Sequence, residues 1–462
     1  RSTLFPYTTL FRSIIEIKID IPAEVGTLID ELNAAGFEAF AVGGCVRDSI
    51  MGKVPRDWDI CTSAEPCDMH RVFSHRRVIE TGIRHGTLTV FADDAGHYEI
   101  TTYRVDGEYR DNRHPESVTF TKDINSDLAR RDFTINAIAY NYTKGLVDPF
   151  EGIEDIGRKM IRCVGDPGKR FDEDALRIMR CIRFASELGF DIDSSTAYSA
   201  AVKKKLLHNI SAERIRIEFN KLLCGEGATQ VMRTYRDIVA EVVPEIRAAF
   251  DFDQRTPYHI YDVWEHTLRV LYHTEPDIKL KLIAFFHDLG KPEMFTIRNG
   301  RGHFYRHEKV SEEIARTVLA RLKYDNDTIY HVCSVIRNHS IIFQRSAKQA
   351  RRLLLKLGEE DLRMLIKLEC ADVKGQNPAF RDDRMALISD FSKILDMVIG
   401  ASQCFSMRDM AINGNDLIDI GIRQGPEIGR ILKKLLDMII EEEINNDRDI
   451  LLLKAREIAG KS

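Results

Sequence analysis

The fold of this chain is decided by the stretch GGCVRDSIMGKVPRDWDI, residues 43–60. The preceding FEAFAV predicts a short strand, the paired glycines a turn, and VRDSIMG the start of a helix. Asp57 and Asp59 are two residues apart, so on a strand both carboxylates point to one face, about 6.8 Å apart along the chain. Carboxylates so placed can hold two Mg²⁺ ions roughly 4 Å apart, which activate a hydroxyl and neutralise a triphosphate.

The residues just before the two acids suit a phosphate group. Gly43 and Gly44 let backbone N–H groups approach phosphate oxygens, and Arg47 offers a fork of donors. Taken singly, the glycine pair is more often a plain turn, and two acids spaced by two are more often a solvated strand end. Their occurrence together, in this order, favours a site that binds metal and nucleotide.

Composition limits what the chain can be. At 462 residues it exceeds one ordinary core and predicts about three domains, at roughly 150 residues each. The apolar fraction of 44% and charged fraction of 30% are typical of a globular protein, and no apolar run predicts a membrane span. A net charge of -5 excludes a global basic field, so any nucleic-acid surface must be local. Nine cysteines without a CxxC pair indicate free thiols and a cytoplasmic setting.

Changes of pattern along the chain predict the domains. Residues 1–13, RSTLFPYTTLFRS, show neither a signal-peptide core nor periodicity and are interpreted as a non-native leader, with a genuine arm as the alternative. Residues 14–150 contain strand-like runs (WDICTS, GTLTVFAD, HYEITTYR, SVTFT) and predict a mixed lobe with an antiparallel component. Helical periodicity then predominates, with breaks that predict domains at 151–250, 251–400 and 401–462. The expected fold class is α+β, a mixed sheet with helices followed by all-helical domains.

The quoted motifs resemble one family. GGCVRDSIMG followed by PRDWDI resembles the polymerase-beta-like head of the class II tRNA nucleotidyltransferases and bacterial poly(A) polymerases. DLARRDFTINAIAYN, residues 127–141, resembles the second motif of that family, which implies that Arg131 and Asp132 recognise the ribose hydroxyls. GLVDPFEGIEDI resembles the hinge between head and neck, marked by Asp148 and Gly152. The resemblance extends from about Ile21 to the end of the chain.

A third motif, FDEDALRIMRCIRFASELGF from Phe171, resembles the family's nucleotide-selecting EDxxR signature. On a helix Asp174 and Arg177 are neighbours, so an acceptor and a forked donor lie side by side. They match the exocyclic amine and the ring acceptor of cytosine or adenine, whereas guanine and uracil present the opposite pattern. The resemblance implies a protein template for CTP and ATP, with Arg180 and Arg183 reaching the triphosphate. An ordinary amphipathic helix laced with salt bridges is the alternative.

Two further segments have an equally plain alternative reading. The polar linker from Asp106 to Phe120 carries Arg110, Arg113 and His114. Its position matches the family loop thought to help the pocket switch from CTP to ATP, but a solvated hairpin connection explains it equally well. SAERIRIEFNKLL, from Ser211, resembles the neck helix of the family. Its structural reading is simply a capped helix, with Ser211 as a candidate N-cap.

A second set of residues that could bind metal lies in the middle of the chain. It comprises His266, His287, Asp288, His307, His339 and Asp372. The adjacent His-Asp pair in AFFHDLGKP resembles the signature of the HD phosphohydrolase superfamily. Imidazoles with carboxylates suit a divalent transition metal. A single buried histidine is more often an ordinary core residue, but the ordered set favours an HD domain, which is catalytic in some members of the family and structural in others.

The function implied by the resemblance is addition of CCA to the 3′ end of tRNA, with CTP, ATP and Mg²⁺. A poly(A) polymerase or an A-adding enzyme using ATP alone is the first alternative, since the same base reader serves ATP. Rivals of other classes are an HD phosphohydrolase with an inert head and a non-catalytic RNA-binding module. In the tail, Arg430, Lys433 and Lys434 form a basic edge that suits a tRNA backbone, or else a solvated helix face. Oligomeric state is left open.

Overall fold

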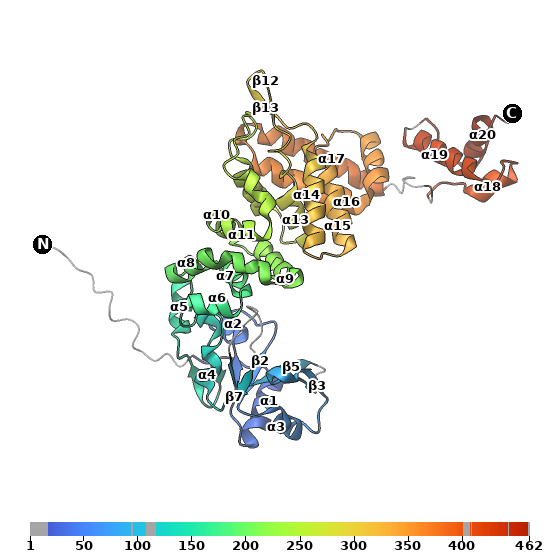
Figure 1. Cartoon of the computed structure of the whole chain (residues 1–462). Helices are drawn as coiled ribbons and strands as arrows, with labels where there is room; N and C mark the ends of the chain where they lie inside the picture. The colour runs from blue at the N-terminus through green and yellow to red at the C-terminus, as the bar shows by residue number, and fades with distance from the viewer. Residues whose placement is uncertain are drawn as a thin grey trace. The chain divides into compact units, whose positions relative to one another are not determined.

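The computed structural model describes residues 17–93, 96–107, 117–400, 407, 409–441 and 443–460. The chain divides into two compact units, Arg1–Val242 and Val243–Ser462. Figure 1 shows the sheet in the first unit and the largely helical second unit. The predicted leader, residues 1–13, and the loop residues Arg110, Arg113 and His114 lie outside the described residues.

A seven-stranded mixed sheet forms the head, in the order β3-β4-β5-β2-β1-β8-β9. Its strands are β1 (Ala39–Val42), β2 (Asp59–Thr62), β3 (Val78–Gly82), β4 (Thr87–Phe91), β5 (His97–Thr102), β8 (Ala139–Asn141) and β9 (Gly145–Val147). Only the β2–β5 pair is parallel among these strands, and all other neighbours are antiparallel. The predicted α+β class with an antiparallel component is therefore confirmed.

Short helices flank the central strands of this sheet. They are α1 (Ala23–Ala34), α2 (Gly44–Ile50), α3 (Pro66–Val72) and α4 (Ile124–Ala129). All four residues of β1 are buried, and α1 packs against both β1 and β2. Phe40 and Val42 belong to a core cluster that also contains Tyr103 and Leu128. A separate hairpin, β6 (Arg104–Asp106) with β7 (Val118–Phe120), flanks the undescribed part of the polar linker.

The predicted hinge motif connects the sheet to the neck through α5 (Gly152–Arg158). The Asp148 carboxylate accepts the N–H groups of Gly152 and Ile153 at 2.7 and 2.9 Å. A Cβ at Gly152 would lie 2.2 Å from the Thr134 carbonyl oxygen, in η2 (Thr134–Asn136) of the head. Only glycine allows this approach of two backbones.

The neck continues as α6 (Pro167–Glu173), α7 (Leu176–Leu188), α8 (Ser194–Lys203), η3 (Lys204–Asn209), α9 (Ala212–Cys224), α10 (Ala228–Thr234) and α11 (Arg236–Val242). Helices α7 and α9 pack together. Ser211 is the N-cap residue of α9, but its side chain makes no capping hydrogen bond. The neck is not entirely helical, because β10 (Met160–Ile161) pairs in parallel with β11 (Asp191–Ile192).

The second unit begins with η4 (Pro244–Ala249), α12 (Val263–His273) and α13 (Ile278–Phe286). A short hairpin, β12 (Thr296–Arg298) with β13 (Arg301–His303), again departs from the all-helical prediction. Then follow α14 (His307–Arg321), α15 (Asn326–Asn338), α16 (Ala347–Gly375), η5 (Pro378–Phe380) and α17 (Arg381–Gly400). Helix α16 packs against α12 and α17, and non-helical backbone at Gly358 interrupts it.

The tail has a small core of its own, formed by α18 (Gly414–Asp419), α19 (Pro426–Ile440) and α20 (Arg448–Ile458). Leu417, Ile431, Leu435 and Leu451 are buried in it. Within the described parts of the chain, no helix has both the length and the apolar character needed to cross a membrane.

Candidate active site and candidate metal centre

The two acids of the first motif lie at the start of β2. The sequence predicted that both acids lie on the strand. The strand begins at Asp59, so Asp57 lies just before it. Exposure nevertheless alternates, because Asp57 and Asp59 reach solvent whereas Trp58 and Ile60 are buried. Residues that alternate in this way point to opposite sides of the chain. Both carboxylates therefore lie on the solvent side of the strand.

A third acid, which the sequence analysis missed, lies on the neighbouring strand. Asp59 is paired in register with Glu99 of the parallel strand β5, and Glu99 is exposed too. Partial removal of water raises the pKa of Asp59, and the nearby Glu99 and Asp57 raise it further, against the lowering effect of Arg131. The sequence motifs could not identify Glu99, because the pairing of β2 with β5 brings it to Asp59 and no sequence spacing does.

The glycine turn leads directly into this site. Gly43 has a φ of 83° and precedes α2, and a Cβ there would lie 3.1 Å from Arg131 Nη1. Arg47 is buried, donates through Nη1 to Asn136 Oδ1 at 2.6 Å, and contacts Asp48 Oδ1 through Nε and Nη2 at 2.9 and 2.7 Å. Arg47 was predicted to hold phosphate. In this structure its Nε, Nη1 and Nη2 atoms instead contact Asp48 and Asn136 and so stabilise the turn.

Asp132 of the second motif is buried and fully engaged. Its Oδ1 accepts from the N–H of Phe133 and from Asn136 Nδ2, and its Oδ2 accepts from Arg180 Nε at 2.7 Å. Burial alone would raise the pKa of Asp132, but Arg180 and Arg177 outweigh it and lower that pKa to about 2. The ion pair between Arg180 of α7 and Asp132 therefore connects the neck to the second motif.

The third motif does not form the continuous helix that the sequence predicted. Helix α6 ends at Glu173, Asp174 is extended at φ -133° and ψ 102°, and α7 begins at Leu176. The Asp174 carboxylate accepts from Arg214 Nη2 at 2.9 Å, while Arg177 Nη1 donates to Glu173 Oε2 at 2.7 Å. Arg177 and Asp174 remain close through the backbone, where the Arg177 N–H donates to the Asp174 carbonyl at 3.0 Å.

Arg183, predicted to reach the triphosphate, is engaged in structural contacts. Its Nε donates to Glu218 Oε2 at 2.8 Å and its Nη1 to Glu187 Oε2 at 2.7 Å. The guanidinium also lies 3.5 Å from the centre of the Phe184 ring. This end of α7 matches the alternative reading of an amphipathic helix laced with salt bridges.

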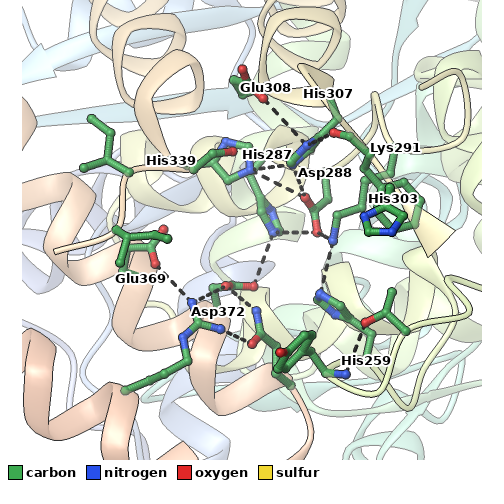
Figure 2. Close-up of a pocket in the computed structure, with 18 of the residues that line it drawn as sticks. His259, His287, Asp288, Lys291, His303, His307, Glu308, His339, Glu369 and Asp372 are labelled. Carbon is green, nitrogen blue, oxygen red and sulfur yellow. Dashed lines mark hydrogen bonds and ion pairs between the residues drawn. The ribbon is translucent and has the colours of Figure 1, made fainter. Parts of the chain in front are cut away.

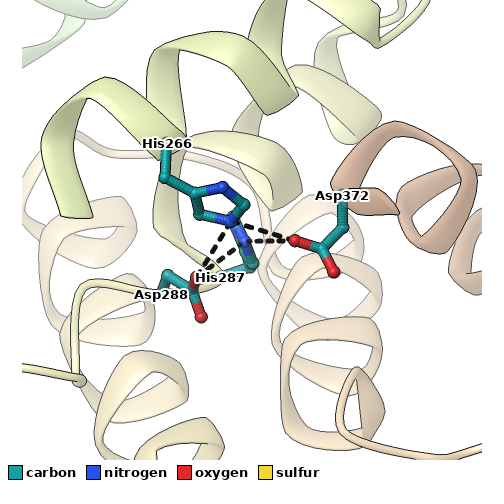
Figure 3. Close-up of side chains that lie close together, drawn as sticks. All are labelled: His266, His287, Asp288 and Asp372. Carbon is teal, nitrogen blue, oxygen red and sulfur yellow. Dashed lines mark ion pairs between the residues drawn. The ribbon is translucent and has the colours of Figure 1, made fainter. Parts of the chain in front are cut away.

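The second unit brings together all six predicted histidines and aspartates, here called the histidine–aspartate cluster (His266, His287, Asp288, His307, His339 and Asp372). In its first half, His266 Nε2 lies 2.9 Å from Asp372 Oδ1 and 3.2 Å from Asp288 Oδ2. His287 Nε2 is also 3.2 Å from Asp288 Oδ2. Figure 3 shows these side chains converging from α12, the end of α13 and α16.

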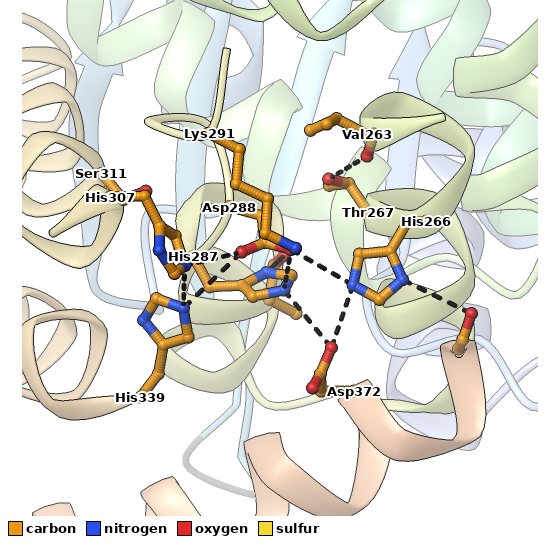
Figure 4. Close-up of polar contacts among 12 residues, drawn as sticks. Val263, His266, Thr267, His287, Asp288, Lys291, His307, Ser311, His339 and Asp372 are labelled. Atoms are coloured by element: carbon orange, nitrogen blue, oxygen red, sulfur yellow. Dashed lines mark hydrogen bonds and ion pairs between the residues drawn. The ribbon is translucent and has the colours of Figure 1, made fainter. Parts of the chain in front are cut away.

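The second half of the cluster lies around the other carboxylate oxygen of Asp288. Asp288 Oδ1 is 3.2 Å from His307 Nε2 and 3.6 Å from His339 Nε2, and the two imidazole nitrogens are 3.0 Å apart. His307 begins α14, and His339 follows the end of α15 (Figure 4).

All four histidines direct the same nitrogen into the cluster. The Nδ1 atoms of His287, His307 and His339 lie 2.7–2.8 Å from the carbonyl oxygens of Ala284, Phe304 and Ile336. His266 Nδ1 lies 3.4 Å from the carbonyl oxygen of Gly375. A carbonyl can only accept, so each Nδ1 carries a proton, and Nε2 of the neutral imidazole is the atom that could bind a cation.

The charge and unsatisfied atoms of the cluster also fit a metal. His266 Nε2 and His287 Nε2 are buried and make no hydrogen bond, although carboxylate oxygens of Asp288 and Asp372 lie 2.9–3.2 Å away. Burial disfavours protonation of His287, but the carboxylates of Asp288 and Asp372 outweigh it and raise the pKa of His287 to about 10. The two carboxylates favour positive charge beside them; Lys291 Nζ supplies one charge, 2.6 Å from Asp288 Oδ2, and a divalent cation would supply more.

A cavity of about 920 Å³ adjoins the cluster. His287, Asp288, His307, His339 and Asp372 form part of its lining, and Figure 2 shows them with Lys291. Arg301, Arg306 and Arg384 line the cavity too. Lys291 Nζ lies 2.6 Å from Asp288 Oδ2 and donates to Gln254 Oε1 at 2.9 Å. The lining also includes Glu308 and Glu369, so four acidic side chains balance its four lysine and arginine side chains.

Three family models match the chain. A poly(A) polymerase head domain matches residues 39–162, a probable RNA and SrmB binding site of polymerase A matches residues 189–249, and a putative second domain of tRNA nucleotidyltransferases matches residues 304–455. With the mixed sheet and its acids, these matches define the class as the nucleotidyltransferases with a poly(A) polymerase type of head.

The relatives narrow the class to a family. The chain is 33% identical over 431 residues to the CCA-adding enzyme of Pediococcus pentosaceus, covering 92% of this chain and 95% of the relative. It is 35% identical over 436 residues to that of Leuconostoc citreum, covering 93% and 95%. A crystal structure of the Bacillus stearothermophilus CCA-adding enzyme in complex with CTP is similar at 26% identity, with a TM-score of 0.70 over 95% of this chain and 97% of that one. This chain belongs to the CCA-adding enzymes, a family of tRNA nucleotidyltransferases.

Proposed function

We propose that this protein adds CCA to the 3′ end of tRNA from CTP and ATP, without a nucleic-acid template. The observation that carries the chemistry is the group of acids at the start of β2, where Asp59, two residues after Asp57, pairs in register with Glu99. Cys45 of the glycine turn contacts the Asp59 carbonyl oxygen through Sγ at 4.0 Å. Membership of the CCA-adding family supports the choice of substrate. Free thiols at the eight described cysteines agree with a cytoplasmic setting.

Asp57 and Asp59, with Glu99, are the residues proposed to hold Mg²⁺. Burial raises the pKa of Asp59, and the charges of Glu99 and Asp57 raise it further against the effect of Arg131. Hard carboxylate oxygens are the ligands that Mg²⁺ prefers. Bound Mg²⁺ would polarise the phosphates and favour deprotonation of the tRNA 3′ hydroxyl. In the reaction the 3′ oxygen forms a bond to the α-phosphorus, the bond to the β-phosphate breaks, and pyrophosphate leaves.

The remaining head and neck residues are proposed to orient the nucleotide. The N–H groups after Gly43 and Gly44 face the phosphates, with Arg131 beside them, while Asp132 accepts from a ribose hydroxyl. Asp132 already accepts three hydrogen bonds, so nucleotide must share or displace one of them.

Base selection is assigned to Asp174 and Arg177. The free protein pairs Asp174 with Arg214, so a cytosine or adenine amine would replace or share that contact. Arg177 is held by Glu173, which limits the orientations of its donors. A guanine or uracil would place an acceptor against the carboxylate, which accounts for their rejection.

The direct test of CCA addition uses tRNA that ends at the discriminator base. CTP alone should add two residues, ATP alone little, and both together the complete CCA end. Incorporation of AMP only, in any mixture, would instead identify a poly(A) polymerase or an A-adding enzyme.

The resemblance of the histidine–aspartate cluster to the HD phosphohydrolase signature supports a second proposal. We propose that this cluster is an HD-type metal site that takes no part in polymerisation. Replacing His287 and Asp288 by Ala should leave CCA addition within about twofold of wild type. Loss of polymerisation in this variant would contradict a head-centred mechanism. In the tail, Arg430, Lys433 and Lys434 are exposed on α19 and are proposed to contact the tRNA backbone.

A further inference from the structure

We propose that Phe184 is a positioning residue for the nucleotide triphosphate, and that its ring holds Arg47 of the head and Arg180 of the neck where both can reach the phosphates. The inference rests on the proposed function and adds to it a residue to which the sequence motifs assign no role. It turns on three guanidinium groups that converge on one buried ring.

The ring of Phe184 lies where the head meets the neck. The guanidinium carbon of Arg47, in α2, is 5.2 Å from the ring centre, that of Arg180, in α7, is also 5.2 Å away, and that of Arg183 is 3.5 Å away. Phe184 is buried, and its ring packs edge-on against Phe133 of the head with 5.8 Å between ring centres. An aromatic face attracts a cation within about 6 Å. One side chain therefore acts on arginines from two parts of the first unit.

The ring itself is held in a fixed place. Arg183 packs closest to it, and the Arg183 guanidinium is bound to Glu218 at 2.8 Å and to Glu187 at 2.7 Å. Arg180 lies four residues before Phe184 in the same helix, so the two side chains share one face of α7. Arg47 and Arg180 thus meet a ring whose position is set by other contacts.

A chain of hydrogen bonds joins the same two arginines by a second route. Arg47 Nη1 donates to Asn136 Oδ1 at 2.6 Å, and Asn136 Nδ2 donates to Asp132 Oδ1 at 3.2 Å. Asp132 Oδ2 then accepts from Arg180 Nε at 2.7 Å. Together with Phe184 these residues form a closed loop, so the position of one guanidinium depends on that of the other.

Arg47 keeps donors for a ligand within this arrangement. It lies beside the glycine turn, because a Cβ on Gly44 would be 3.7 Å from Arg47 Nη2. Its bonds to Asp48 and Asn136 use Nε and one hydrogen each of Nη1 and Nη2. A guanidinium has five N–H groups, so two of them have no acceptor among the described residues. The contact with the ring uses none of them.

Arg180 also keeps donors for a ligand. Its Nε and Nη2 atoms contact one carboxylate oxygen of Asp132, whereas its Nη1 atom is 3.9 Å from Glu218 Oε1, which is beyond hydrogen-bond distance. The side chain is partly exposed, so a phosphate oxygen can approach it.

A ring suits this task better than another carboxylate would. A carboxylate would hold an arginine through its N–H groups, cancel its charge and repel the triphosphate. An aromatic face holds the cation while leaving both its charge and its N–H groups for the ligand. Charge-assisted hydrogen bonds to phosphate are stronger than the ring contact, so Phe184 sets the position of the arginines without competing for them.

The alternative is that Phe184 only fills space in the core. Packing depends on the shape of the ring and not on the negative charge of its face. A residue that only packs would also affect every ligand of the site alike, whether or not that ligand carries β- and γ-phosphates. These two differences define the test.

Calorimetric titration of the full chain with Mg²⁺ measures the binding of CTP, inorganic tripolyphosphate and CMP. In one variant Phe184 is replaced by 3,4,5-trifluorophenylalanine, which nearly keeps the shape of the ring but weakens the negative charge of its face. The second variant is Phe184→Leu. The dissociation constants of CTP and tripolyphosphate should rise about fivefold in the fluorinated protein and about tenfold in Phe184→Leu, since two cation–π contacts are weakened or lost. Binding of CMP should change by less than about twofold.

Phe190→Leu is the matched control. Phe190 is buried just beyond the end of α7, and within the described parts of the chain no lysine or arginine lies against its ring. The control loses the same ring atoms from the same region, so it should bind all three ligands as the wild type does. Circular dichroism detects unfolding, and if Phe184→Leu unfolds, the fluorinated protein decides the question.

Unchanged binding of CTP and tripolyphosphate in the fluorinated protein would overturn the inference, as would a loss of CMP binding as large as the loss of CTP binding. Wild-type protein that adds CCA to tRNA alongside either result would leave the proposed function standing. Wild-type protein that binds CTP in the Phe184-dependent way but adds no nucleotide to tRNA would refute the proposed function alone.

Discussion

Asp132→Asn should destabilise the first unit by about 2 kcal/mol at neutral pH. The pKa of Asp132 is lowered to about 2 from a model-peptide value near 3.8, because Arg180 and Arg177 favour its charged form. At 1.36 kcal/mol per pKa unit, this difference corresponds to roughly 2 kcal/mol of stability. The side chain is 8% exposed, so solvent screening is small. The amide keeps an acceptor for the Phe133 N–H but removes the nearest charged partner of Arg180, which retains Glu218 at 3.9 Å.

The sign of the pH dependence follows from the lowered pKa. The contribution of Asp132 is fully present above the unfolded pKa near 3.8 and is lost as the pH falls through the folded pKa of about 2. The difference in unfolding free energy between wild type and Asp132→Asn should therefore be constant from pH 7 to about pH 4.5 and shrink below that.

Urea denaturation followed by the fluorescence of Trp58 isolates the first unit, provided that Trp264 is replaced by Phe in all proteins. The control Asp93→Asn removes a carboxylate that pairs with Arg76 but is 92% exposed, and it should change stability by less than about 0.5 kcal/mol. A destabilisation of Asp132→Asn below 0.5 kcal/mol at pH 7, or one that grows as the pH falls, would refute the reasoning.

Three further substitutions test separate parts of the head and neck. Glu99→Gln removes an acid paired with Asp59 and should therefore lower nucleotide incorporation at least about 100-fold. Circular dichroism should show that the fold is retained. A wild-type rate in this variant would show that Glu99 does not belong to the site. Gly152→Ala should lower the free energy of unfolding, measured by urea denaturation, by about 3 kcal/mol or more, because its Cβ would lie 2.2 Å from a carbonyl oxygen. In the control Gly157→Ala, in the same helix, the new Cβ meets no atom within 4 Å, so stability should be unchanged or increased. Asp174→Ala should reduce the preference for CTP and ATP over UTP and GTP in competition assays by at least about tenfold, and unchanged selectivity would exclude it as the base reader.

Local sequence predicted the acidic motif and the glycine turn well, because both depend on short-range geometry. The spacing of Asp57 and Asp59 sets their common side even though the strand begins only at Asp59. Gly43 occupies the positive-φ position that only a glycine adopts without strain.

Features created by distant partners could not be predicted in the same way. Glu99 enters the site through the parallel pairing of β2 with β5. The break between α6 and α7 places Asp174 in an extended conformation, where Arg214, forty residues later, holds its carboxylate. Helix propensity alone gave no sign of this break, since tertiary contacts override it.

For the histidine–aspartate cluster, the sequence predicted which residues belong to it but not how they are arranged. Its six members were recognisable from their order in the sequence, and the structure brings them together. Their division around Asp288 depends on how α12, α14, α15 and α16 present them, which no spacing encodes.

CCA addition is tested most directly by sequencing the products formed on tRNA that ends at the discriminator base. The wild-type protein with CTP and ATP should produce ends that read CCA and then stop, and Asp59→Asn should produce none. Tails of adenosine alone, or CCA ends formed equally well by Asp59→Asn, would contradict the account.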